Sequence, residues 1–170
     1  MKPSPNARDL IKKFEGLRTK PYMLNGKLNI GYGHTQDVQP TDTITPQQAE
    51  GYLDSHLMDA SRQLNRYLKR EPTQMQYDAM LSLVYNMGIG AFSRSDVLSR
   101  FNAGDDPGAG EAFLKYDNSY APDGTRVRYP GLTRRRQAER DLFLVSPGVP
   151  EPPSEMWSMP AIRTKDGYFS

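Results

Sequence analysis

Two capping boxes constrain the middle of the chain to be helical. Thr45-Pro46-Gln47-Gln48 supplies a threonine N-cap, a proline at the first helical position and a glutamine at the third, which is typical of a helix start. The segment 73–76 repeats the threonine and glutamine spacing. Because apolar residues then recur at helical spacing, we predict helices over 46–68 and 74–87, with Gly88 as the cap of the second. The stripes comprise Ala49, Leu53, Leu57, Ala60, Leu64 and Leu68, and then Tyr77, Met80, Leu81 and Val84.

The N-terminal region predicts another helix and a small sheet. Apolar residues at helical spacing indicate a helix over 7–15, with Asn6 as N-cap and Gly16 as its stop. Asn25-Gly26 then separates two short runs, 22–24 and 27–30. Asn-Gly is the strongest local signal for a β-hairpin, because both central residues of a type I′ turn need a positive φ.

The remaining sequence predicts shorter helices and a tail. Helices are expected over 95–101, 109–116 and 133–144, with a polar loop over 118–130. From Ser146 onward the sequence holds five prolines and no periodicity. We therefore predict one mostly helical α+β domain over 1–145 and a proline-rich tail over 146–170, packed on the surface or partly disordered.

Composition excludes several classes of protein. The chain has no cysteine, and its only histidines are His34 and His56, so we expect neither a metal site nor a cofactor. Apolar runs of about four or five residues are too short to span a bilayer. The start lacks the apolar core of a secretory signal, so we expect synthesis in a cytoplasm. No heptad pattern or broad apolar stripe demands a dimer, which favours a monomer.

The net charge is only +2, but arginines crowd the last third of the chain. A basic patch suits an anionic polymer, although charge alone favours a solvated helix face. These arginines are Arg126, Arg128, Arg134, Arg135, Arg136 and Arg140.

Four blocks follow one another in the order and spacing of a known family. The first runs from Glu15-Gly-Leu-Arg through Tyr22 to Ile-Gly-Tyr-Gly-His-Thr at 30–35. The others are QYDA with YNMGIGAF (76–79 and 85–92), LSRFNAGD (98–105) and GLTRRRQAER (131–140). Together they resemble the phage-type lysozymes, the endolysins of tailed phages, over about residues 7–145. The last block also accounts for the arginines better than nucleic-acid binding does.

The resemblance implies a lysozyme-like fold, with a helical lobe and a small β-hairpin lobe flanking a substrate cleft. It implies a muramidase that cuts bacterial peptidoglycan between N-acetylmuramic acid and N-acetylglucosamine, with Glu15 as general acid. It also implies that an arginine of the last helix approaches this acid; Arg135 is the best placement, and its two neighbours are equally possible. Leu24, Gly33 and Thr35 are expected to line the substrate site. The C-terminal end of a helix disfavours a negative charge, which suits a carboxyl group that must donate a proton.

The family's second polar group is missing from the hairpin. The family pattern has an aspartate in the first hairpin strand and a threonine before Ile-Gly. Counting forward from Glu15 places Leu24 at the aspartate position, counting back from Ile30 places Met23 there, and Asn29 replaces the threonine. In a two-residue hairpin, Leu24 and Asn29 share a face that we expect to point toward the cleft, and Met23 lies on the opposite, core face.

Three mechanisms follow from this difference. Asn29 can hold a water molecule while Glu15 drives hydrolysis, or Asp37 or Asp42 can move in as a base. Alternatively, the 6-hydroxyl of muramic acid can attack, as in lytic transglycosylases, which is compatible with a single acid. In the third, catalysis is lost and the domain only binds peptidoglycan. The expected site of action is the cell wall in the periplasm, reached through a holin pathway, as a virion component or as a secreted effector.

Overall fold

The computed structural model describes residues 1–24, 26–121 and 123–146. Nearly all of the predicted tail 146–170, and Asn25 of the predicted turn, lie outside the described residues. The helices are α1 (Pro5–Glu15), α2 (Pro46–Asn65), α3 (Gln74–Met87), α4 (Ile89–Phe92), α5 (Asp96–Asn102), α6 (Asp106–Ala112), the 3-10 helix η1 (Phe113–Tyr116) and α7 (Pro130–Phe143). The strands are β1 (Arg18–Leu24), β2 (Lys27–Gly31), β3 (Asn118–Tyr120) and β4 (Arg126–Arg128).

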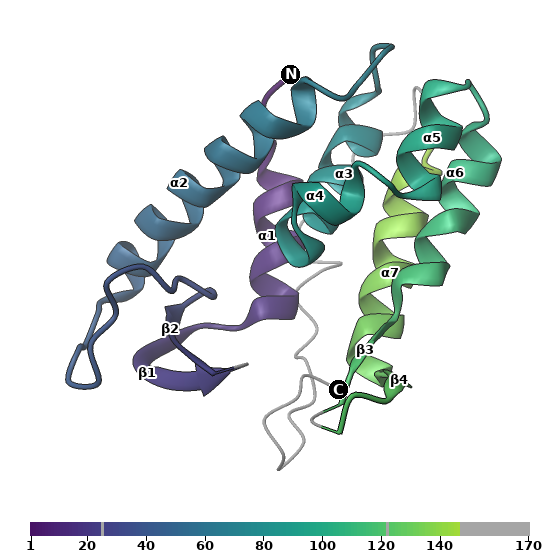
Figure 1. Cartoon of the computed structure of the whole chain (residues 1–170). Coiled ribbons are helices and arrows are strands. Elements are labelled where there is room, and N and C mark those ends of the chain that lie inside the picture. The colour runs from purple at the N-terminus through teal and green to yellow at the C-terminus, as the bar shows by residue number, and fades with distance from the viewer. Residues whose placement is uncertain (25, 122, 147–170) are drawn as a thin grey trace.

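Helix α3 is the centre of the helical body. It contacts α1, α2 and α7, and Figure 1 shows it between the purple α1 and the yellow-green α7. All residues from 75 to 84 are buried, the polar ones included. A helix that is buried all round needs partners for its polar side chains. Those of Gln76, Tyr77 and Asp78 are Thr73, Ser61 and Ser4. Ser82 pairs with Glu139 of the site described below.

The two predicted capping boxes are present at the starts of α2 and α3. In α3, the Gln76 amide donates to Thr73 Oγ1 at 3.2 Å, and the Thr73 amide donates to Gln76 Oε1 at 3.0 Å. Helix α2 ends at Asn65 rather than Leu68, although Leu68 still packs against the core. The N-cap of α1 is Ser4 and not Asn6, because Pro5 occupies the first helical position and the Ser4 hydroxyl accepts from the Asn6 amide.

The N-terminal hairpin has the predicted register. Leu24 pairs with Lys27, Met23 with Leu28 and Tyr22 with Asn29. The prediction that Met23 lies on a core face is wrong, because its side chain is 65% exposed.

The exposure of Met23 follows from the pattern of burial in the hairpin. Along β2, burial rises from the exposed tip to the buried base instead of alternating between the two faces. The β2 strand packs on α2, and Figure 1 shows the hairpin below the lower end of α1.

The C-terminal half contains elements that the sequence did not indicate. The predicted helix 109–116 is divided into α6 and η1, and α6 begins earlier, at Asp106, with Asp105 as its N-cap. The predicted loop 118–130 contains the antiparallel hairpin β3–β4. Helix α7 begins at Pro130, three residues before the predicted start.

Candidate active site

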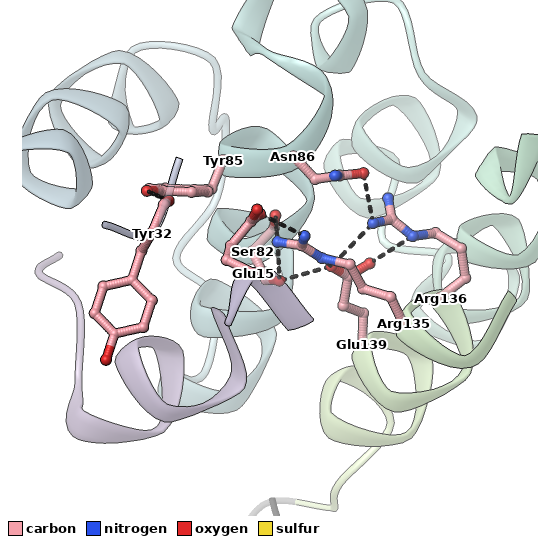
Figure 2. A network of polar contacts seen from close by, with 8 residues as sticks. All are labelled: Glu15, Tyr32, Ser82, Tyr85, Asn86, Arg135, Arg136 and Glu139. Atoms are coloured by element: carbon pink, nitrogen blue, oxygen red, sulfur yellow. Dashed lines mark hydrogen bonds and ion pairs between the residues drawn. The ribbon is translucent and has the colours of Figure 1, made fainter. Parts of the chain in front are cut away.

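Glu15 ends α1 and meets an arginine from the other end of the chain. Arg135 Nη1 donates to Glu15 Oε1 at 2.7 Å across a separation of 120 residues. The Arg135 side chain is 4% exposed, whereas that of Glu15 is 20% exposed. The contact therefore joins a buried cation to a carboxylate that solvent or a ligand can still reach (Figure 2).

The guanidinium of Arg135 is held on its other sides as well. Its Nε donates to Glu139 Oε1 at 3.1 Å, and its Nη2 donates to the Ser82 carbonyl oxygen at 3.3 Å. Burial acts to lower the pKa of Arg135, but the carboxylates of Glu15 and Glu139 outweigh burial and raise the pKa above its ordinary value. Arg135 is therefore a fixed positive charge with its planar group oriented by α3 and α7.

The two neighbouring arginines do not contact Glu15 in the same way. Arg134 is exposed. Arg136 is fully buried, donates to Asn86 Oδ1 at 2.9 Å and pairs with Glu139 Oε2 at 3.0 Å. Desolvation lowers the pKa of Arg136 to about 10, against the opposing effect of Glu139. Of the three candidates, Arg135 is the one that the structure brings to the acid.

Tyrosines border Glu15 on the side of the hairpin. The Tyr85 hydroxyl on α3 donates to the carbonyl oxygen of Tyr32 at 2.8 Å, which ties the helical body to the chain after β2 (Figure 2). Burial, and then the nearby Glu15 carboxylate, raise the pKa of Tyr85 far above its ordinary value. The same two causes raise the pKa of Tyr22 on β1. Both phenols therefore stay neutral beside Glu15.

Gly33 lies beside Glu15 and is partly buried, whereas Thr35 is exposed. The φ of Gly33 is +93°, and a Cβ at this position would come within 3.8 Å of Glu15 Oε2. Its backbone therefore passes beside the second carboxylate oxygen in a conformation that favours glycine. Thr35 is exposed, after the short bridge between Ile30 and His34.

The hairpin brings no carboxylate to the expected position. Leu24 is half-buried at the end of β1. Asn29 is only 6% exposed, and its Nδ2 donates to the Lys27 carbonyl oxygen at 2.8 Å. The Asn29 side chain was expected to face an open cleft, but its burial leaves it little surface for a water molecule.

The two aspartates considered as substitute bases lie at a different pocket. Asp37 and Asp42 are both part of its lining, and the Asp42 carboxylate accepts from the Gln39 amide at 2.8 Å. The pocket has a volume of about 310 Å³, and its lining among the described residues includes neither Glu15 nor Leu24.

Within the described ranges, no group of three or more His, Asp or Glu side chains could hold a metal ion. No helix in the described part of the chain is long and apolar enough to cross a membrane.

Sequence reasoning missed Ser82, Tyr85 and Glu139. A signal for Glu139 was present, because it follows Arg135 by four residues and so shares a helix face with it. Ser82 and Tyr85 carried no such signal, since serine and tyrosine within a helical pattern are ordinary.

The fold and this acid–arginine pair define a lysozyme-like protein, with a helical body and a small hairpin lobe. Residues 12–139 match the phage lysozyme family. The chain therefore belongs to the phage lysozyme family.

Individual relatives agree with this assignment. The chain is 44% identical over 135 residues to an endolysin of Acyrthosiphon pisum secondary endosymbiont phage 1, an alignment that covers 79% of this chain and 92% of the relative. Its fold is similar to the muramidase domain of SpmX from Asticaccaulis excentricus (TM-score 0.80, 36% identity, 85% and 99% of the two chains). It is also similar to the endolysin from Escherichia coli O157:H7 phage FAHEc1 (TM-score 0.80, 35% identity, 85% and 94%).

Proposed function

We propose that this protein is a muramidase that cleaves the glycan strands of bacterial peptidoglycan between N-acetylmuramic acid and N-acetylglucosamine. The observation that carries the proposal is the partly exposed carboxylate of Glu15, held by the buried Arg135 beside the base of the hairpin. Similar proteins named endolysin and muramidase support the same class of substrate.

Glu15 is the general acid in this proposal. Glycoside cleavage requires a proton on the leaving oxygen, and the exposed side of Glu15 can present one. After the transfer, the remaining carboxylate is stabilised by the charge-assisted hydrogen bond from Arg135. Leu24, Gly33 and Thr35 are proposed to contact the sugar chain.

The second half of the reaction has two candidate routes. In hydrolysis, a water molecule attacks the anomeric carbon of muramic acid, positioned by Asn29 or activated by Asp37 or Asp42 after a local movement. In the lytic transglycosylase route, the 6-hydroxyl of muramic acid attacks its own anomeric carbon, the glycosidic bond breaks, and Glu15 returns as the base for the hydroxyl proton.

Two features of the hairpin weaken the case for a base on the protein, so we propose the transglycosylase route as an equal alternative to hydrolysis. Leu24 cannot accept a proton, and the Asn29 amide nitrogen is already engaged by Lys27. Both routes need no cofactor, and we propose that the protein acts as a monomer on the cell wall, reached through a holin pathway or with a virion.

Digestion of purified sacculi tests the proposal. We expect the wild-type protein to release soluble muropeptides and Glu15→Gln to release none, because glutamine cannot donate the proton. Mass spectrometry of the fragments separates the routes, since anhydro ends are lighter by one water than reducing ends.

Glu71→Gln is the matched control, because this glutamate is exposed and lies outside the site. It should retain wild-type release. Equal inactivity of wild type and Glu15→Gln, with both proteins still sedimenting with sacculi, would replace the enzyme proposal by a peptidoglycan-binding module.

A further inference from the structure

Glu139 is a buried carboxylate between two arginines of its own helix. Its side chain is fully buried. Oε1 accepts from Arg135 Nε at 3.1 Å and from the Ser82 hydroxyl at 2.6 Å, while Oε2 lies 3.0 Å from Arg136 Nε (Figure 2). A buried charge persists only where it is paired, so these three contacts make Glu139 part of one unit with both arginines.

This unit fixes the direction of Arg135. The three nitrogens of its guanidinium have separate partners: Nε has Glu139, Nη2 has Ser82, and Nη1 has Glu15. Because the group is planar and rigid, holding Nε and Nη2 aims Nη1 at the acid.

The same unit balances charge around Glu15. Two buried arginines would favour its ionised form, in which it has no proton to donate. Glu139 offsets one of these charges from within the cluster. The phenols of Tyr85 on α3 and Tyr22 on β1 also interact with Glu15, and both are neutral. Asp117 is a further carboxylate that acts on Arg136.

We propose that Glu139 is a positioning residue for the acid: it orients Arg135 toward Glu15 and limits the combined pull of the two arginines on the Glu15 proton. The inference rests on the proposed role of Glu15 as general acid. Glu139 itself touches no substrate, since its side chain is enclosed by α3 and α7.

Glu139→Gln removes the charge and keeps the shape. Without the negative charge, the Glu15 carboxylate is stabilised by the arginines, so protonation of Glu15 requires a lower pH. We expect the alkaline limb of the pH–activity profile for muropeptide release to move down by about one pH unit. Glu139→Asp retains the charge and should keep the limb within about 0.3 pH units of wild type, even if its rate is lower.

A purely structural role gives a different result. In that case Glu139→Gln lowers the melting temperature and leaves the limb in place, which overturns the proposal. The Glu71→Gln variant serves as the control for both measurements.

Arg136→Met covers the case in which Glu139→Gln does not fold. It removes the competing positive charge, so the limb should move to higher pH, opposite to the first variant. An unmoved limb in this variant overturns the proposal.

A titration of the Glu15 side-chain carboxyl by ¹³C NMR reads the same displacement without activity. If wild type releases no muropeptides but the NMR midpoint moves as stated, the proposed function fails and the role of Glu139 stands. If muropeptides are released and neither the midpoint nor the limb moves, the proposed function stands and the role of Glu139 fails.

Discussion

We propose that Leu24 stands where the hairpin would otherwise carry a catalytic carboxylate. It ends β1 opposite Lys27 and is half-buried, close to the tip of a hairpin whose other face is exposed at Met23. A leucine here can contact a sugar ring, but it cannot orient or activate water. In the proposed mechanism, this position therefore supplies no base for the second step.

Leu24→Asp should raise hydrolytic activity if the missing base limits the rate. General bases contribute roughly 10²–10⁴-fold, and an untuned carboxylate should recover about tenfold, measured as reducing ends released from sacculi. Met23→Asp is the matched control, because it adds the same charge at the adjacent position on the opposite face of the strand. An unchanged rate for a folded Leu24→Asp protein would indicate that the chain uses the intramolecular route.

At the scale of elements, the starts of α2 and α3 were predictable from sequence because each is fixed by contacts within four residues. The exposed hairpin β3–β4 was not, since its strands bury no alternating apolar face. The contact of Arg135 with Glu15 was expected only from the family resemblance. Nothing local in either segment indicates it, and it forms only when α1 and α7 pack against the same central helix.

Loss of the N-cap of α3 should lower the free energy of unfolding of the protein. Thr73→Ala removes the hydroxyl that accepts from the Gln76 amide, and we expect the free energy of unfolding to fall by about 1 kcal/mol in urea denaturation. Thr73→Ser keeps the acceptor and should stay close to wild type. Equal losses in both variants would show that the methyl group, and not the cap, stabilises this end.

At the scale of the molecule, two histidines join the hairpin segment to the helical body. His34 Nδ1 lies 3.1 Å from His56 Nε2 on α2, and the His34 ring stacks on Tyr52 with centroids 4.0 Å apart. Desolvation, and then the proximity of His34, lower the pKa of His56, while Asp59 opposes them. The folded protein therefore favours the uncharged form of His56.

Stability should consequently fall in mild acid. Because the pKa of His56 is lower in the folded protein than in the unfolded chain, the unfolded chain binds more protons as the pH drops below about 6.5. We expect a loss of about 0.5–1 kcal/mol between pH 7.5 and 5.5, since water screens a half-buried ring. Chemical denaturation at the two pH values measures it.

His56→Gln should remove most of this dependence. The lowered pKa of Glu50 acts below about pH 4.5 and stays outside the window. If the variant keeps the full wild-type slope, the histidine junction is not its source.

Helix α3 supplies Ser82, Tyr85 and Asn86 from one face, and these three side chains reach Arg135, the Tyr32 carbonyl and Arg136. One rigid helix thus sets the spacing between the arginine cluster and the base of the hairpin, while the hairpin tip has no part in it. We therefore expect substitutions at Leu24 to leave the contact between Arg135 and Glu15 in place. The frame that holds the proposed acid is thus built apart from the hairpin tip, so we expect a change at the tip to alter how the reaction finishes without altering how it starts.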